Sequence, residues 1–155
     1  KIRELMPHCC IGVDVIVGFP NETKEDFLET YRFINELDVT YLHVFTYSER
    51  ENTLAAEMPN PVPMHIRRER NEMLRILSEK KKRHFYEKFI GETRKVLFEN
   101  SKEPGLMSGF TDNYLKITTA YDPLMINEIS EVELLRLTEN TEIEVALVDD
   151  LEIVH

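Results

Sequence analysis

Cysteine, glycine and long apolar runs are scarce in this chain of 155 residues. Its two cysteines, Cys9 and Cys10, are sequence neighbours, so they build no disulfide framework and indicate a reducing, cytoplasmic location. No stretch approaches the roughly 20 apolar residues of a membrane-spanning helix, and no secretory signal is visible. With 5 glycines and 7 prolines, the composition excludes collagen-like and low-complexity chains. We expect a globular protein without a membrane partner, and a fragment, because the chain begins at Lys1.

Charge is abundant but unevenly distributed. The chain carries 19 Lys and Arg against 29 Asp and Glu, a net charge of −10 that argues against general nucleic-acid binding. Residues 1–91 hold 14 basic and 15 acidic residues, whereas residues 92–155 hold 5 and 14. Nine of the basic residues lie between His65 and Lys88. A basic segment therefore precedes an acidic C-terminal region.

The first third of the chain has the pattern of a strand, a helix and a second strand. Residues 11–19 are nearly all apolar and rich in β-branched side chains, which is typical of a strand in a parallel sheet. Thr23 and Asp26 offer a capping box for a helix over about 24–37 with one apolar face. Residues 41–47 are strand-like again, so the segment predicts a right-handed βαβ unit.

Alternation divides each strand into two faces. One face is purely aliphatic and is expected to meet covering helices; it carries Val13, Val15, Val17, Leu42 and Val44. The other face is mixed and is expected to line the inside of a curved or barrel-like sheet; it carries Gly12, Asp14, Ile16, Gly18, Tyr41, His43, Phe45 and Tyr47. Ligands gather at the carboxyl ends of parallel strands, here residues 18–23 and 47–53, where Arg50 lies.

Two polar residues of the mixed face have two interpretations each. His43 is either a hydrogen-bonded core histidine or a ligand-binding one. Asp14, among aliphatic neighbours, is either a structural anchor that needs hydrogen-bond donors or a site residue. The turn after Gly18 lacks the glycine spacing and the Lys-Ser/Thr pair of a P-loop.

A long helix is predicted to follow. Pro61 and Pro63 are placed to start it, apolar residues recur at helical spacing, and Gly91 is placed to end it, so residues 61–91 form a connecting helix. Its basic residues are either a solvated face or a surface for a nucleic-acid backbone, with Lys80, Lys81 and Lys82 as the candidates.

Beyond Gly91 the pattern changes to five short strands, over 93–98, 106–111, 114–119, 131–137 and 143–148. This spacing predicts a small antiparallel barrel of OB-like shape. Such barrels bind RNA through stacking aromatics with basic groups nearby, and the candidates are Arg94, Lys95, Phe110, Tyr114 and Lys116. In the alternative interpretation Phe110 and Tyr114 belong to the core. The net charge of −9 over residues 92–155 limits any RNA contact to a local one.

Four stretches resemble a known family. GVDVIVGFPNETKEDF (12–27) and YLHVFTYSERENTLAAEM (41–58) resemble the last third of the radical S-adenosylmethionine core of the methylthiotransferases, which modify a tRNA adenosine or a ribosomal protein. GETRKVLFE (91–99) and GFTDNYLKITT (109–119) resemble the start of that family's TRAM domain. YLHVF with YSER is most similar to the branch that acts on threonylcarbamoyladenosine beside the tRNA anticodon.

The resemblance implies a fold and a set of partners. Residues 1–60 would be the C-terminal part of the α/β radical S-adenosylmethionine (βα) barrel, 61–91 a connecting helix, and 92–155 an all-β TRAM barrel. The cofactor would be S-adenosylmethionine and the partner the anticodon stem-loop of tRNA. A homo-oligomer through the exposed edge of the truncated barrel is a further expectation.

The family's motifs fall on particular residues of this chain. The strand motif that flanks the cofactor's adenosine falls on Ile16 and Gly18, and the glutamate at the sheet's carboxyl edge is Glu22. Arg50 suits the cofactor's carboxylate or an RNA phosphate. The implied cofactor-binding set, taken with the mixed face, is Asp14, Ile16, Gly18, Glu22, His43, Phe45, Tyr47 and Arg50.

Two departures from the motifs concern loops. Asn21 replaces the last glycine of the family's GFPGET turn, and because Asn tolerates positive φ we expect the turn to persist. Asn52 replaces the glycine of the YSxRxGT stretch, so that loop is expected to be shaped differently.

The family's cluster motif is missing. Its chemistry needs a [4Fe–4S] cluster held by a C-x₃-C-x₂-C loop, which this sequence does not contain. Cys9 and Cys10 are expected to be small buried residues instead. We therefore expect no metal site and no catalytic residue in this chain, clusters with ligands outside it, and no activity of the fragment alone. Two alternatives stay open: a non-catalytic RNA-binding module, and a ribosomal-protein methylthiotransferase.

Overall fold

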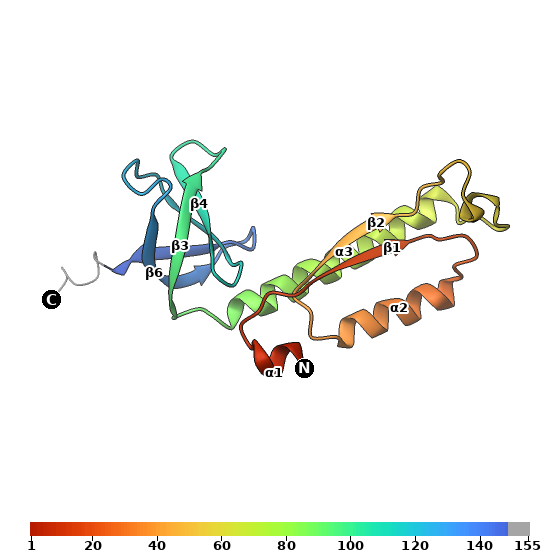
Figure 1. The fold of residues 1–155 in the computed structure, drawn as a ribbon, viewed down its shortest axis with the longest axis horizontal. Coiled ribbons are helices and arrows are strands. Elements are labelled where there is room, and N and C mark those ends of the chain that lie inside the picture. Colours follow the sequence, from red (N-terminus) through yellow and green to blue (C-terminus); the bar gives the residue numbers. More distant parts are fainter. Residues whose placement is uncertain (149–155) are drawn as a thin grey trace. The chain divides into compact units, whose positions relative to one another are not determined.

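The computed structural model describes residues 1–148, and in it the chain forms two compact units (Figure 1). The α/β unit comprises residues 11–82. The barrel unit comprises residues 1–10 and the described chain from Arg83 on. The predicted residues 149–155 of the C-terminal barrel lie outside the described residues. Among those described, no helix combines the length and apolar character needed to cross a bilayer.

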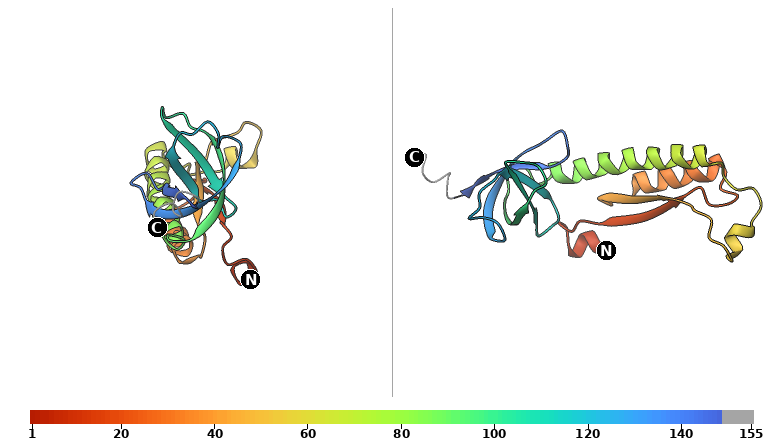
Figure 2. Two further views of the ribbon diagram at one scale, coloured as in Figure 1. Left: turned by 90° about the vertical axis from the view of Figure 1, so that its left-hand side faces the viewer. Right: turned by 90° about the horizontal axis from the view of Figure 1, so that it is seen from above.

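The α/β unit confirms the predicted βαβ arrangement. Strand β1 (Gly12–Val17) pairs in parallel with β2 (Tyr41–Thr46), and α2 (Lys24–Glu36) connects them. Helices α2 and α3 (Met64–Glu87) lie on one side of the strand pair (Figure 2). The short 3-10 helix η1 (Leu54–Glu57) lies between β2 and α3.

Local sequence signals explain where the helices begin. The Thr23 hydroxyl accepts from the Asp26 N–H at 3.1 Å, and the Asp26 carboxylate accepts from the Thr23 N–H at 2.9 Å, which is the predicted capping box. Asn21 has the positive φ expected of it, 68°. Helix α3 begins directly after Pro63, whose carbonyl accepts from the Ile66 N–H at 3.0 Å.

The aliphatic face of the strand pair meets the helices, as predicted. Its core holds residues from both strands and both helices: Val17, Leu42, Phe27, Ile34, Leu74 and Leu77. Each such side chain contributes about 1.5–3 kcal/mol of hydrophobic free energy relative to an exposed position. The mixed face is open in this chain rather than lining an interior, and Ile16 and Phe45 are exposed on it.

Side chains of α3 also satisfy backbone groups of β2. The Ser78 hydroxyl accepts from the Leu42 N–H at 2.8 Å and donates to the Leu42 carbonyl at 3.2 Å. The Asn71 amide donates to the Val44 carbonyl at 3.1 Å. Fewer backbone groups of β2 are therefore left for pairing with a further strand.

The barrel unit contains the five predicted strands: β3 (Thr93–Asn100), β4 (Leu106–Thr111), β5 (Lys116–Ala120), β6 (Ile129–Leu137) and β7 (Ile143–Leu147). In the part of the chain that the structure describes, they close in the order β3-β4-β5-β7-β6 (Figure 1). Fully buried side chains fill the interior, among them Val96, Phe98, Met107, Leu115, Ile117, Val132, Leu134 and Ile143.

The prediction of a purely antiparallel barrel was wrong, because β5 and β7 pair in parallel. A closed ring with an odd number of strands cannot reverse direction at every pair, so at least one parallel pair is unavoidable. Here that seam is formed by Ile117 with Ile143 and Thr118 with Glu144. Tyr114, predicted inside a strand, lies in the turn before β5.

The N-terminal segment belongs to the barrel unit. Helix α1 (Ile2–Leu5) places the Arg3 guanidinium 5.3 Å from the ring centre of Phe85, and Arg3 also donates to the Cys9 carbonyl. Cys10 packs against the barrel core. Within the described residues neither cysteine is in a disulfide, and both are half-buried rather than buried as predicted.

Candidate functional site

A buried arginine of α3 holds the segment that follows β2. Arg67 is 4% exposed and donates to three groups: from Nε to the Val62 carbonyl at 2.7 Å, from Nη1 to the Tyr47 carbonyl at 2.9 Å, and from both Nη atoms to the Glu49 carboxylate. These bonds satisfy the guanidinium on several sides. The hydrogen bonds from Arg67 lower the pKa of Glu49 from 4.5 to about 2.

Gly18 fits this arrangement for two separate reasons. Its φ is 80°, in the left-handed region that glycine adopts without steric cost. A Cβ at this position would lie 2.4 Å from Cγ of Arg67. The need for glycine at the end of β1 is thus explained by the arginine packed against it.

A second arginine of α3 holds the turn that follows β1. Arg70, with its side chain 8% exposed, donates to the Glu22 carbonyl at 3.1 Å and forms an ion pair with the Glu22 carboxylate. The other carboxylate oxygen of Glu22 accepts from the Gly18 N–H at 3.0 Å. Glu22, predicted as a cofactor residue, therefore has both carboxylate oxygens engaged within the chain.

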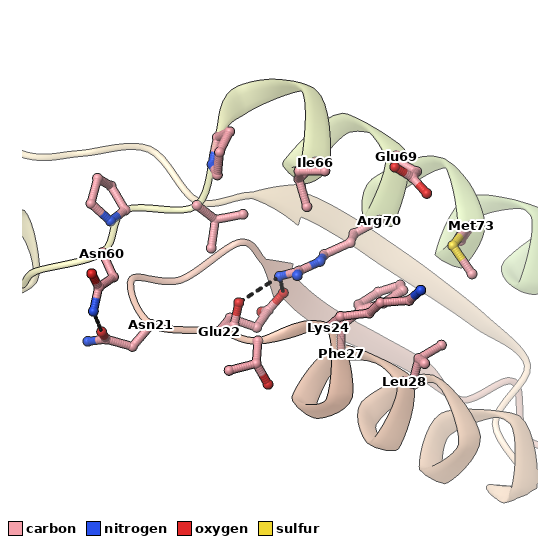
Figure 3. A pocket seen from close by; sticks show the side chains of 14 residues that line it. Asn21, Glu22, Lys24, Phe27, Leu28, Asn60, Ile66, Glu69, Arg70 and Met73 are labelled. Atoms are coloured by element: carbon pink, nitrogen blue, oxygen red, sulfur yellow. Dashed lines mark hydrogen bonds and ion pairs between the residues drawn. The ribbon is translucent and has the colours of Figure 1, made fainter.

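A cavity of about 740 Å³ lies between the first turns of α2 and α3, with Arg70 and Glu22 in its wall (Figure 3). Its apolar lining includes Phe27, Leu28, Ile66 and Met73. Among the predicted cofactor residues, Glu22 alone lines it. Its lining residues belong to α2, α3 and the segments that directly precede these helices, and none of them lies in β1 or β2.

The mixed face brings the predicted cofactor residues together in pairs. Asp14 is the register partner of His43, and Ile16 is the register partner of Phe45. All four are exposed. Neither residue is buried by the described chain, so both interpretations of His43 and of Asp14 stay predictions. Their burial would depend on chain segments that pack over this face, which the sequence of the strands does not encode.

Tyr47 and Arg50 follow β2 but differ in their surroundings. The Tyr47 ring lies edge-on to Phe19 at 5.3 Å and 5.4 Å from Cζ of Arg67. Its hydroxyl is buried without a hydrogen-bond partner in the part of the chain that the structure describes. Arg50 is exposed and lies in a loop where Asn52 adopts a φ of 62°, in the left-handed region.

The three candidate lysines of α3 do not form one surface patch. Lys81 donates from Nζ to the Leu37 carbonyl at 2.7 Å and to the Asn35 carbonyl at 3.0 Å, at the C-terminus of α2. Burial lowers the pKa of Lys81. Lys80 is exposed and Lys82 is half-buried. The interpretation of Lys81 as part of a solvated face is therefore wrong.

The barrel unit carries an exposed aromatic pair. Phe110 and Tyr114 stack with ring centroids 4.9 Å apart and planes at 30°. Both rings are exposed, so the interpretation that places them in the core is wrong. Tyr114 adopts a φ of 69°, which costs a residue other than glycine about 1–2 kcal/mol.

The basic candidates beside this pair are all bound to carboxylates. Arg94 contacts Glu92 at 2.7 Å and Asp112 at 3.3 Å. Lys95 lies 3.7 Å from a carboxylate oxygen of Glu131, and Lys116 forms an ion pair with Glu142. The predicted phosphate contacts are therefore already paired within the barrel.

The arginine contacts were missed from the sequence, although a signal existed. Arg67, Arg70, Leu74 and Leu77 follow one another at intervals of three or four, which places them on one face of α3. All four are buried. The helical spacing thus places both arginines on the buried face of α3. The sequence interpretation assigned them to a solvated face because they are charged.

In the described residues, a βαβ unit is followed by a small closed barrel that carries an exposed, stacked aromatic pair. No family model matches the chain. It is 36% identical over 140 residues to threonylcarbamoyladenosine tRNA methylthiotransferase MtaB of Bacillus subtilis, covering 88% of the chain and 31% of that protein.

Two further relatives come from other organisms. The Aquifex aeolicus protein of the same name is 41% identical over 117 residues, 75% of this chain and 27% of that protein. A tRNA-2-methylthio-N(6)-dimethylallyladenosine synthase of Acinetobacter baumannii is 31% identical over 136 residues, 86% of this chain and 28% of that protein. The chain belongs to the tRNA methylthiotransferase family, and it spans under a third of the length of these relatives.

Proposed function

We propose that this chain is the cofactor-facing and tRNA-facing part of a radical S-adenosylmethionine methylthiotransferase. The enzyme would add a methylthio group to C2 of a modified adenosine beside the tRNA anticodon, with threonylcarbamoyladenosine as the favoured substrate. The supporting observation is the 36–41% identity to proteins named for that nucleoside. A relative named for dimethylallyladenosine reaches 39% over a shorter segment, so the nucleoside is what needs testing.

The mixed face fits S-adenosylmethionine in its chemistry. The exposed pair Ile16 and Phe45 offers an apolar contact for an adenine ring, and the neighbouring pair Asp14 and His43 offers polar groups for a ribose. When bound, this cofactor supplies both the radical and the methyl group. Glu22 would support this face indirectly, because its carboxylate pairs with Arg70 and accepts from the Gly18 N–H.

The residues that the structure describes do not fit an iron–sulfur cluster. No three His, Cys, Asp or Glu side chains among them gather where they would hold a metal ion. Cys9 and Cys10, as neighbours in the sequence, do not reproduce the family's ligand spacing. We therefore place the cluster ligands outside this chain and expect the isolated chain to be inactive.

The barrel unit would be the TRAM domain, in contact with the anticodon stem-loop. A closed five-stranded barrel over the described residues is compatible with that assignment. From the sequence we assign residues 1–60 to the radical S-adenosylmethionine barrel, 61–91 to a connecting helix and 92–155 to the TRAM domain; in the structure, residues 1–10 and 83–91 group with the barrel unit. The reaction on tRNA implies a cytoplasmic enzyme.

A chimera tests this function. The segment of Bacillus subtilis MtaB that aligns with this chain is replaced by it, and the chimera is produced in a strain that lacks the native enzyme. We expect mass spectrometry of tRNA nucleosides to detect the methylthio derivative of threonylcarbamoyladenosine. The native enzyme serves as the positive control.

Two results would count against the proposal. A folded chimera that leaves all adenosines unmodified would contradict the proposed activity. Methylthiolation of dimethylallyladenosine instead, scored in a second strain that lacks the corresponding synthase, would contradict the proposed nucleoside while keeping the chemistry.

A further inference from the structure

The cavity between the first turns of α2 and α3 has no part in the proposed function. Its volume of about 740 Å³ lies within the range of about 300–1,000 Å³ that is typical of sites for small molecules. Much of its wall is apolar (Figure 3). Five side chains that form this apolar wall are Phe27, Leu28, Val62, Ile66 and Met73. Such a lining favours an apolar ligand, because each contact removes apolar surface from water.

The charges of the lining cancel. Its four charged residues are Glu22, Lys24, Glu69 and Arg70, two of each sign. Glu22 and Arg70 form an ion pair, whereas Lys24 and Glu69 are exposed. The lining therefore offers no net attraction to an ion, and a charged ligand would lose its hydration against the apolar wall without compensation. This balance of charge favours a neutral ligand.

A buried side chain of the lining can donate hydrogen bonds to a ligand. The Arg70 side chain is 8% exposed, and its Cζ lies 5.4 Å from the ring centre of Phe27. Both of its hydrogen bonds to described residues leave from Nη1, toward the carbonyl and the carboxylate of Glu22. Because every guanidinium nitrogen carries donors, Nε and Nη2 are left for an acceptor of the ligand. The ligand that fits thus combines an apolar ring with an acceptor such as a carbonyl oxygen.

The polar part of the wall also holds the segments that follow β1 and β2. Glu22, paired with Arg70, accepts from the Gly18 N–H at 3.0 Å, directly after β1. The Asn21 N–H donates to the Asn60 carbonyl at 3.1 Å, and the Asn60 side-chain amide donates to Oδ1 of Asn21 at 2.9 Å (Figure 3). These bonds join the turn after β1 to the segment between β2 and α3. A ligand that rigidifies the wall therefore restrains both segments.

We propose that this cavity is a regulatory site for a small neutral molecule that combines an apolar ring with a hydrogen-bond acceptor. The bound molecule restrains the turn after β1 and the segment after β2, and so lowers the mobility of the carboxyl edge of the strand pair. The inference uses only the lining and the contacts of the α/β unit, so it does not depend on the reaction proposed for the full protein.

The binding test uses the full chain of 155 residues and the fluorescent probe prodan. Prodan is a neutral naphthalene with a ketone carbonyl, and its emission shifts to the blue in apolar surroundings. We expect saturable binding of one probe molecule per chain. The anionic probe anilinonaphthalene sulfonate should bind about tenfold more weakly, because the lining does not compensate its charge.

Tryptophan variants locate the bound probe, since the chain contains no tryptophan of its own. Met73→Trp fills the cavity from α3 and should weaken prodan binding about tenfold, and Leu28→Trp fills it independently from α2. Ile76→Trp is the matched control, because Ile76 is exposed on the same helix and is not part of the lining. This variant should bind prodan like the original chain. Thermal unfolding followed by circular dichroism confirms that each variant is folded.

Amide hydrogen exchange tests the regulatory role. Saturating prodan should slow exchange of the Gly18 and Asn21 N–H groups about tenfold, because the acceptors of both belong to residues of the cavity wall. The Phe98 N–H, in the core of the barrel unit, is the control and should exchange as before.

Four outcomes would overturn the inference. The first three concern binding: no saturable binding of prodan, unchanged affinity in the folded cavity-filling variants, or tighter binding of the anionic probe, which would identify a charged ligand instead. The fourth concerns regulation: bound prodan that leaves the exchange of Gly18 and Asn21 unchanged.

Discussion

The α/β unit and the barrel unit differ in where their arginines form ion pairs: in the interior of the first and at the surface of the second. In the α/β unit, Arg67 and Arg70 are buried and donate to backbone carbonyls as well as to carboxylates. In the barrel unit, pairs such as Arg136 with Glu144 lie at the surface. Buried pairs become costly when one partner is removed, whereas exposed pairs contribute little. We therefore expect the arginines of the α/β unit to matter for its stability and the surface pairs of the barrel to contribute little.

Removing a buried guanidinium should have the largest effect. Arg67→Ala leaves the Val62 and Tyr47 carbonyls without their donor, and we expect the α/β unit to lose about 3 kcal/mol of stability. Urea unfolding followed by circular dichroism measures it. The control, Arg68→Ala, changes an exposed neighbour on the same helix. Equal losses for the two variants would show that burial of Arg67 has no energetic importance.

Gly18 and Gly105 have nearly the same φ, so alanine substitutions at the two positions distinguish the cost of backbone strain from the cost of a steric clash. Gly18→Ala combines a φ of 80° with a Cβ that would lie 2.4 Å from Arg67, and should cost about 2 kcal/mol. Gly105→Ala has a φ of 79° but no atom within 4 Å of its Cβ, and should cost about 1 kcal/mol. Thermal or urea unfolding compares them. If Gly105→Ala proved the more damaging, the close packing of Arg67 would not explain Gly18.

Lys81 should contribute less than the arginines. Lys81→Ala removes the donor to the Asn35 and Leu37 carbonyls, and we expect a loss of about 1 kcal/mol. Lys80→Ala, one residue away and exposed, should be neutral. Amide hydrogen exchange at the C-terminal turn of α2 should rise in the first variant alone. Unchanged exchange would indicate that water replaces the lysine at no cost.

The smallest effect should be a pH dependence from Glu49. Its pKa of about 2, against 4.5 ordinarily, means that the folded protein favours the charged carboxylate. This stabilisation is complete above pH 4.5 and is lost as the pH falls toward 2. Glu49→Gln should flatten the pH profile of unfolding in that range, by an amount limited by solvent exposure of the group. Glu51→Gln is the matched control, and an identical profile for the two variants would refute the assignment.

Local sequence signals predicted the features that depend on a few neighbouring residues. The capping box at Thr23 and the left-handed Asn21 were both predicted from the sequence. The exposure of Asp14 and His43 was not, because it depends on what packs over their face of the sheet. The burial of Arg67 was not predicted either. Its spacing from the apolar residues of α3 indicated burial, but its charge favoured an exposed position. The acceptors of Arg67 are the Tyr47 and Val62 carbonyls and the Glu49 carboxylate. These groups come from segments that only the folded structure brings to the arginine, so a sequence pattern does not reveal them.

The parallel seam of the barrel has a consequence for its motions. Strands β5 and β7 are joined through Ile117 with Ile143 and Thr118 with Glu144, a shorter ladder than any other in the ring. The Lys116–Glu142 ion pair joins the same two segments. Local opening begins where a cooperative unit has the fewest hydrogen bonds to break, so we expect the barrel to open locally between β5 and β7. When β5 and β7 separate, the closed barrel becomes an open sheet with two exposed edge strands. Each edge can then pair with a strand of another chain.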